Sequence, residues 1–156
     1  MTNEKTPRKT VCRNKKVRYN YDIIDTYEAG LSLQGTEVKS LRNGKASINE
    51  AYIRPQASGL YLFDMHISPY TNAGPFQHSE KRPRQLLLHN REIRKIVSDI
   101  SRKGLTAVPM DVHFSGRGWA KTRIAVCRGK KTYDKRDKMK KKEDQREMQR
   151  EKNRRR

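Results

Sequence analysis

The stretch V-P-M-D-V-H-F-S-G-R-G-W-A-K-T-R-I-A-V-C at residues 108–127 decides the fold. Every second residue of its first part is apolar, namely Val108, Met110, Val112 and Phe114. This period of two is typical of a β-strand. Ser115–Gly118 predicts a hairpin turn. Trp119–Cys127 then predicts a returning strand, with Ile124 and Val126 facing inward.

Further strands are predicted on the N-terminal side of this hairpin. The β-rich runs are Tyr21–Tyr27, Leu31–Leu33, Ala51–Arg54 and Leu60–Ile67. Leu31 and Leu33 alternate with polar residues, and Leu60–Ile67 is rich in aromatic and branched residues, which favour strands. Gly30 and Gln56–Gly59 are the predicted turns.

Two helices are predicted between the strands. Thr36 is the expected cap of a short first helix, which Asn43–Gly44 ends. Its inward residues are Val38 and Leu41. The second helix has an apolar stripe at i, i+3, i+4 and i+7: Ile93, Ile96, Val97 and Ile100. Asn90 is its expected cap and Gly104 its expected stop.

These elements predict a mainly β protein: a small OB-like β-barrel with peripheral α-helices and a basic C-terminal tail. Closure of a barrel removes exposed strand edges, although a split α+β sheet fits the pattern almost as well. The predicted organisation has three parts: a mobile N-terminal segment at 1–16, an RNA-binding barrel at 17–128, and a basic tail at 129–156.

The net charge indicates the class of partner. The 37 lysine and arginine residues exceed the 17 aspartate and glutamate residues, so the net charge is +20. Such a chain favours a polyanion, first a nucleic acid and second an anionic membrane. The most basic stretches lack the apolar anchors that a membrane surface requires. Cys12 and Cys127 lie far apart and read as ordinary thiols of a cytoplasmic protein.

The sequence carries no pattern that indicates catalysis. It contains no phosphate-binding loop, nucleophile elbow or zinc-protease helix. The histidines are scattered: His66, His78, His89 and His113. We therefore expect a protein that is not an enzyme and holds neither a cofactor nor a metal. A metal-dependent nuclease is the alternative from another class.

The basic residues are the more informative feature. Lys39, Arg42 and Lys45 cluster at the first predicted helix, and Arg91 opens the second. A charged face is most often only solvated. Here, however, residues 1–128 hold 23 basic and 11 acidic residues. Barrels of this type bind single strands and loops through charge and stacking.

The tail from Gly129 to Arg156 has 14 basic and six acidic residues. It cannot bury enough surface to offset its ordering entropy, so we expect it to be disordered alone. Written as a helix, it carries one basic stripe: Lys138, Lys142, Arg146, Arg150 and Arg154. It is either a solubilising tail or a segment that folds within an RNA-walled channel.

Four stretches together resemble the tmRNA-binding protein family, also called small protein B or SsrA-binding protein. They are Y-E-A-G-L-S-L-Q-G-T-E-V-K-S-L-R at 27–42, M-H-I-S-P-Y at 65–70, R-P-R-Q-L-L-L-H-N-R-E-I at 82–93 and R-G-K-K-T-Y-D-K-R at 128–136. Each alone is weak, but their order along the chain is that of the family.

The resemblance implies an adaptor in trans-translation. The body would bind the tRNA-like domain of tmRNA, within an alanyl-tmRNA complex with elongation factor Tu. The tail would enter the decoding centre and the empty mRNA channel of a stalled ribosome, against 16S rRNA. The incomplete product would then be tagged for degradation. A ribosomal or assembly protein that holds rRNA is the alternative within the same class.

The resemblance also implies site residues. Tyr21, Glu28, Leu87 and His89 match family positions tied to tmRNA binding, and we add Lys39, Arg42, Lys45 and Arg91 for their charge. The segment linked to the ribosome comprises Gly129, Lys130, Lys131, Tyr133, Asp134, Lys135 and Arg136.

Overall fold

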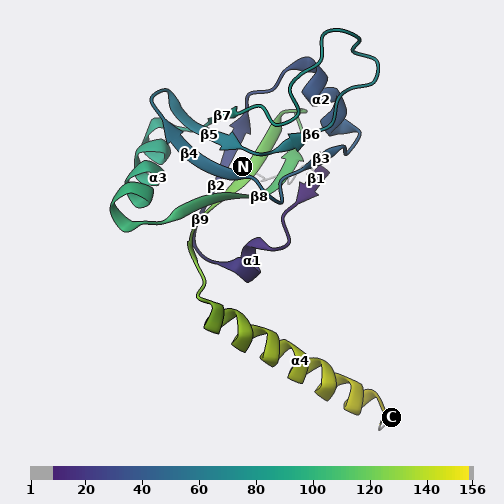
Figure 1. Cartoon of the computed structure of the whole chain (residues 1–156), viewed down its shortest axis with the longest axis vertical. Helices are drawn as coiled ribbons and strands as arrows, with labels where there is room; N and C mark the ends of the chain where they lie inside the picture. The colour runs from purple at the N-terminus through teal and green to yellow at the C-terminus, as the bar shows by residue number, and fades with distance from the viewer. Residues whose placement is uncertain (1–8, 155–156) are drawn as a thin grey trace, which may run out of the picture.

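A computed structural model describes residues 9–154 of the chain (Figure 1). The strands are β1 (Lys9–Arg13), β2 (Tyr21–Leu31), β3 (Ala46–Ser47), β4 (Tyr52–Gln56), β5 (Gly59–Phe63), β6 (His66–Ile67), β7 (Arg84–Leu87), β8 (Thr106–Phe114) and β9 (Ala120–Gly129). The helices are α1 (Val17–Asn20), α2 (Gly35–Arg42), α3 (Asn90–Lys103) and α4 (Thr132–Arg154).

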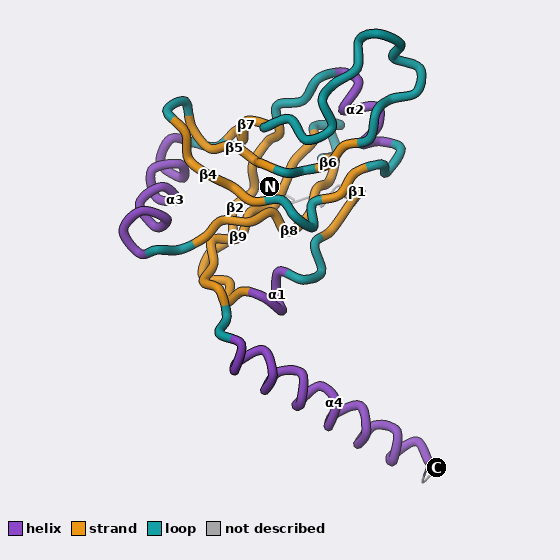
Figure 2. The backbone as a smooth tube through the Cα atoms, in the orientation of Figure 1, coloured by secondary structure: helices purple, strands orange, loops and turns teal. Residues whose placement is uncertain are grey.

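The main sheet closes on itself. Its pairings run β8–β4–β5–β7–β2–β9, and β9 pairs again with β8. β1 joins the outer edge of β8, while β3 and β6 form a separate short pair. Every pairing is antiparallel, and the strands surround a common interior (Figure 2). The predicted mainly β class is confirmed.

Three strands carry a bulge, β1 between Thr10 and Cys12 as well as β2 and β8, and the bulges in β8 and β2 decide which side chains of the hairpin sheet face outward. The β8–β9 register shifts between Pro109 and Asp111, so Met110 is the extra residue. A bulge changes the parity of the strand. As a result, Val112 belongs to the main core, whereas Val108 packs in a smaller cluster beneath α1 with Val17 and Cys127. The second shift lies between Ile23 and Asp25 in β2.

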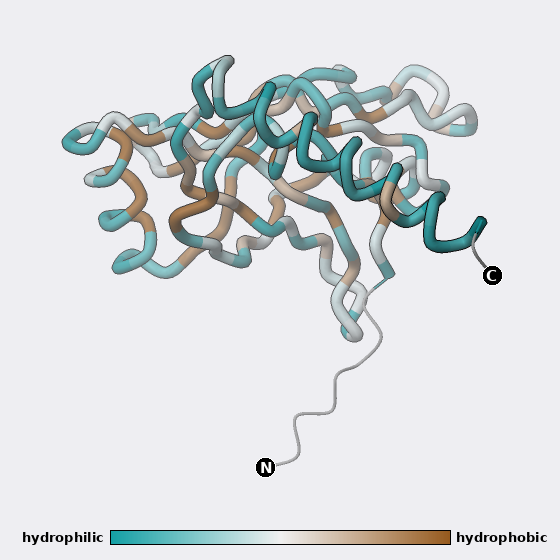
Figure 3. The backbone as a smooth tube through the Cα atoms, turned by 90° about the horizontal axis from the view of Figure 1, so that it is seen from below, coloured by the Kyte–Doolittle hydropathy of each residue, from teal (hydrophilic) through white to brown (hydrophobic). Residues whose placement is uncertain are grey.

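The core fills the ring of strands and reaches both flanking helices. Leu41 of α2 and Ile96 of α3 are fully buried, as is Ile124 of β9. Ile93, Val97 and Ile100 pack beside Ile96, which confirms the predicted apolar stripe. In Figure 3, hydrophobic segments gather inside the body, whereas α4 is hydrophilic along most of its length.

The structure corrects the predicted N-terminal boundary. Lys9–Arg13 forms β1 and pairs with β8, although residues 1–16 were expected to be mobile. Residues 1–8 of that segment lie outside the described residues. β8 has a free edge beyond its short pairing with β4, and β1 occupies it. This long-range pairing has no local sequence signal.

Three local predictions are also wrong. Gly30 lies within β2 and not in a turn. Gln34, not Thr36, caps α2, because the Thr36 hydroxyl instead lies 2.9 Å from His78 Nδ1. His89, not Asn90, caps α3, and its backbone N–H donates to Glu92. The predicted helix ends are confirmed: Gly44 and Gly104 both have positive φ.

α4 leaves the barrel and has no buried residue. It extends away from the body in Figure 1. No helix among residues 9–154 combines the length and apolar character needed to cross a bilayer. Because α4 has no buried residue, it gains little stability from tertiary packing, unlike α2 and α3.

Candidate nucleic-acid interface

A groove of about 410 Å³ lies where β2, β7, β9 and the start of α3 meet. Its lining comprises Glu28, Ala29, Gly30, Leu87, Leu88, His89, Glu92 and Lys121. We call it the interface groove. Three predicted RNA-binding residues, Glu28, Leu87 and His89, therefore lie together although about 60 residues separate them in sequence. The antiparallel pairing of β2 with β7 brings them together.

Leu87 is the apolar element of the interface groove. It is 55% exposed at the end of β7, which is unusual for a leucine in a barrel strand. Gly30 pairs with it in the neighbouring strand. A Cβ at Gly30 would lie only 3.2 Å from the Cβ of Leu87. Gly30 is therefore required for close strand contact and not for a turn, and it fixes how Leu87 is presented.

Glu28 is the acidic element of the interface groove. Its Oε1 accepts a hydrogen bond from Lys121 Nζ at 3.3 Å. Its Oε2 lies 3.6 Å from Nε2 of His113, which is almost fully buried in β8. The carboxylate is thus held between an ammonium group and an imidazole.

The buried carboxylate of Asp111 contacts the ring nitrogen of His113 that does not face Glu28. Asp111 Oδ1 is 3.0 Å from His113 Nδ1, and Asp111 also pairs with Arg123. Burial opposes ionisation of Asp111, but the hydrogen bonds from Arg123 and His113 lower its pKa below the usual value. Asp111 is therefore ionised at neutral pH, and a line of polar contacts runs from Glu28 to Arg123.

His89 and Arg91 stand at the exposed start of α3. His89 is the N-cap, and its backbone N–H lies 3.2 Å from the Glu92 carboxylate that accepts it. This reciprocal bond fixes the entry into α3. The His89 side chain is exposed on the rim of the interface groove, and Arg91 is exposed two residues later in the first turn of α3.

Tyr21 lines a second hollow of about 490 Å³, beside the root of the tail. Its other lining residues are Arg18, Asp22, Ile23, Thr26, Met110, Arg123, Lys130 and Lys138. Arg123 lines this hollow and also reaches the Asp111 carboxylate behind the interface groove. The second hollow therefore shares one residue, Arg123, with the polar contacts that lead to Glu28.

The cations of α2 lie apart from both hollows. Lys39 is over the ring of Tyr70, with Nζ 5.3 Å from the centroid. Arg42 is over Phe114 at 5.8 Å. Lys45 is exposed just beyond the helix. α2 and α3 lie at separate places on the barrel (Figure 1), and Tyr21 lies in the second hollow, so the predicted RNA-binding residues form three groups.

The tail segment begins at the body and becomes exposed within a few residues. Gly129 ends β9, and Lys130 bonds through its backbone to Asn20 and through its side chain to the Arg18 carbonyl. Lys131 is exposed, and Tyr133 is 73% exposed at the start of α4. Asp134, Lys135 and Arg136 follow in the first turns of α4. Asp134 there complements the positive end of the helix dipole.

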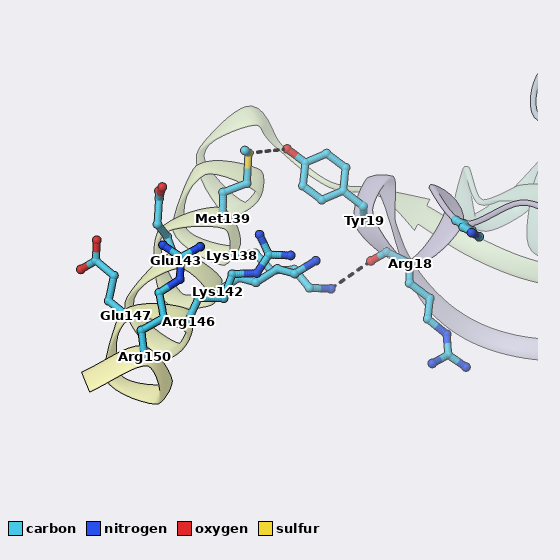
Figure 4. Close-up of a pocket in the computed structure, with 10 residues that line it drawn as sticks. Arg18, Tyr19, Lys138, Met139, Lys142, Glu143, Arg146, Glu147 and Arg150 are labelled. Atoms are coloured by element: carbon cyan, nitrogen blue, oxygen red, sulfur yellow. Dashed lines mark hydrogen bonds between the residues drawn. The ribbon is translucent and has the colours of Figure 1, made fainter. Parts of the chain in front are cut away.

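The first turns of α4 contact the body near α1. Tyr19 donates its hydroxyl hydrogen to Met139 Sδ at 3.0 Å, and Lys138 donates to the Arg18 carbonyl at 3.0 Å (Figure 4). A cleft of about 530 Å³ separates the two helices. Lys142, Arg146 and Arg150 also line it, so the predicted basic stripe faces α1. Most residues that line this cleft carry a charge, with Tyr19 and Met139 as the exceptions.

Sequence reasoning missed the residues that support the interface groove. Lys121, Asp111, His113 and Arg123 lie in the hairpin strands but were not assigned to the site. Their signal was polar residues within a strongly apolar hairpin. The extra residue Met110 places Asp111 and His113 on the face of β8 opposite the main core, and nothing in the sequence pattern indicates this bulge. Among residues 9–154, no group of three potential metal ligands comes together.

Comparison with known proteins assigns the sequence to a family. The family model described as "SmpB protein" matches residues 11–154. An "SsrA-binding protein" from Trichodesmium erythraeum is 48% identical and covers 91% of each chain. One from Desulforudis audaxviator is 49% identical and covers 91% of this chain and 92% of its own.

A solved structure gives the same result in three dimensions. Its chain has a TM-score of 0.65 and 41% identity, and the match covers 78% of this chain and 85% of that one. That structure is described as "tmRNA-SmpB: a journey to the center of the bacterial ribosome". With the family match spanning the barrel and α4, the chain belongs to the SmpB protein family.

Proposed function

We propose that this protein binds tmRNA and acts with it in trans-translation, the rescue of stalled ribosomes. It serves as a binding adaptor and not as an enzyme, and it acts in the cytoplasm. Family membership and the name of its relatives, SsrA-binding protein, support this function. The net charge of +20 supports a nucleic-acid partner.

The interface groove is the surface that binds the tRNA-like domain of tmRNA. Leu87 offers exposed apolar area for an unstacked base, and the His89 ring offers a face for stacking. Glu28 accepts a hydrogen bond from a base amino group, while Lys121 pairs with a phosphate. Tyr21 stacks on a base in the second hollow. This combination suits a structured RNA with exposed loops better than a uniform duplex.

The exposed cations outside the interface groove bind phosphates. Arg91 is close to His89 in sequence and extends the site along α3. Lys39, Arg42 and Lys45 lie on another part of the barrel. They fix the orientation of the RNA or meet a second segment of it, because phosphate contacts position without reading sequence.

The tail binds the ribosome. α4 has 23 residues and no buried side chain, and as a helix it spans about 35 Å. We propose that it enters the decoding centre and the empty mRNA channel, where 16S rRNA phosphates neutralise its basic stripe. Tyr133 stacks on a ribosomal base, and Gly129, Lys130 and Lys131 set the direction of the tail. Elongation factor Tu carries the alanyl-tmRNA complex to the same ribosome.

One observation carries this division of labour: the interface groove contains no residue of α4. A chain that stops after Lys131 keeps all of β9 and the interface groove but loses Lys138 from the second hollow, so it should keep most of its tmRNA affinity, yet it should abolish tagging of a stalled product. The matched control is Met148→Ala, which changes one exposed tail residue and keeps the charge. An equal loss of tmRNA affinity on truncation would contradict the two-part function.

Salt dependence gives a second test of the tmRNA contact. Log affinity should fall steeply as log salt rises, because bound phosphates release counterions. Replacing Lys121 by Ala should reduce the slope by about one phosphate contact. A flat dependence would argue against an electrostatic interface. Recovery of rRNA in place of tmRNA with the purified protein would favour a role in the ribosome itself.

A further inference from the structure

His113 is a buried histidine with an unpartnered nitrogen that points toward the interface groove. The residue is 2% exposed. Among the described residues, its Nε2 and Ser40 Oγ are the buried side-chain polar atoms without a hydrogen bond. Nε2 lies 3.6 Å from Glu28 Oε2, just too far for a hydrogen bond. Leaving a buried polar atom unpaired costs stability, so an alternative state in which it pairs is favoured.

Asp111 fixes which nitrogen of His113 carries the hydrogen. The Asp111 carboxylate only accepts hydrogen bonds, so His113 Nδ1 must be the donor across their 3.0 Å contact. Nε2 therefore carries a hydrogen only when the ring is protonated. In the imidazolium form Nε2–H faces the Glu28 carboxylate, and in the neutral form a lone pair faces it.

The surroundings of His113 contain charges of both signs. The titratable and charged groups around the Asp111–His113 pair are Glu28 of β2, Lys121 and Arg123 of β9, and Cys12 and Arg13 of β1. The residue opposite His113 in β1 is Thr10, which does not titrate. Two carboxylates thus face the ring, and each of them also pairs with a cation, Glu28 with Lys121 and Asp111 with Arg123.

We propose that His113 is a positioning residue whose protonation moves Glu28 between two partners and so adjusts the RNA affinity of the interface groove. This inference rests on the proposed tmRNA function of the groove. The imidazolium donates to Glu28, holds the carboxylate against β8 and offsets its charge. The neutral ring offers no hydrogen to the carboxylate, which then stays with Lys121 and occupies the ammonium that would otherwise pair with an RNA phosphate. RNA affinity therefore rises as pH falls.

The test measures affinity of the full-length protein for the tRNA-like fragment of tmRNA at constant ionic strength, across about pH 5.5 to 8, where imidazoles titrate. The unmodified chain should bind more tightly toward acid, with a slope of at most about tenfold per pH unit because one proton is linked. His113→Gln should flatten this slope. His66→Gln is the matched control, because His66 is exposed and pairs with Glu80 outside the groove.

A second variant separates positioning from a general effect of the mutation. Glu28→Gln leaves His113 in place but removes the carboxylate that it moves, so this exposed-site variant should also lose the slope. Adding His113→Gln to it should change nothing further. If Glu28→Gln or a folded His113→Gln keeps the full slope, the inference is overturned and the proposed function stands. If the unmodified chain fails to bind tmRNA at every pH, the proposed function itself fails.

Discussion

Glu37 of α2 and Arg84 of β7 form an ion pair inside the barrel, with 2.8 Å between Glu37 Oε1 and Arg84 Nη2 and both side chains fully buried. Arg84 also donates to the carbonyl oxygens of Met65 and Glu80. Arg82 reaches the same carboxylate from the surface. The pair thus ties α2 to the strand that ends in Leu87, and it links the core to the interface groove.

Replacing Arg84 by Met should lower the free energy of unfolding by about 3 kcal/mol, because it leaves a buried carboxylate with only a partly exposed partner. Urea unfolding measures this. The double variant Glu37→Gln with Arg84→Met should cost less than the sum of the single changes. Glu80→Gln removes a surface pair and should cost under about 1 kcal/mol. Equal costs for the buried and surface pairs would contradict the assignment.

Stability should fall on acidification. Burial opposes ionisation of Glu37 and Asp111, but hydrogen bonds from Arg82 and Arg123 outweigh it, so both folded-state pKa values are lowered. Their contribution is present above the unfolded-state pKa, roughly 4, and is lost as pH falls through the lower folded value. Melting temperatures between about pH 2 and 6 should show this loss, and Asp111→Asn should reduce it. An unchanged profile in Asp111→Asn would contradict the ionised state of that carboxyl.

Gly30→Ala should weaken tmRNA binding without unfolding the protein. The new Cβ would lie 3.2 Å from the Cβ of Leu87, so Leu87 must shift by a few tenths of an ångström within the interface groove. We expect a loss of roughly threefold to tenfold, or about 1 kcal/mol. Gly35→Ala is the matched control, because nothing lies within 4 Å of its added Cβ. Equal affinities of the two variants would show that the Leu87 position is unimportant.

Both cysteines should react slowly in the folded protein. Burial raises the pKa of the Cys127 thiol to about 11. Burial and the charge of Asp111 raise the pKa of the Cys12 thiol to about 11 as well. Because the thiolate is the nucleophile, alkylation near pH 8 should be slow in buffer and fast in urea, as followed by mass spectrometry. Asp111→Asn should speed alkylation of Cys12 but not of Cys127; equal acceleration would indicate general loosening.

The local elements were largely predictable. The hairpin at 108–127 was recognised from its apolar alternation and its Gly-rich turn. α3 was recognised from the spacing of Ile93, Ile96, Val97 and Ile100, and its end from Gly104. These signals are local because strand pleat, helix pitch and left-handed turns are properties of a few consecutive residues. Caps were missed by one or two residues, because neighbouring polar side chains compete for the same backbone groups.

The sequence by itself determined the mainly β class, the strongly cationic character, the apolar alternation of the hairpin and the highly charged tail, because charge and apolar periodicity are carried by the residues themselves. Only the tertiary structure decided that Lys9–Arg13 joins the barrel, that Arg84 is buried against Glu37, and that Glu28, Leu87 and His89 share one groove. It also decided, through the single extra residue Met110, that His113 faces Glu28. Each of these placements depends on which strands pair and in what register. The pairing and the register are set by the closed ring of strands as a whole.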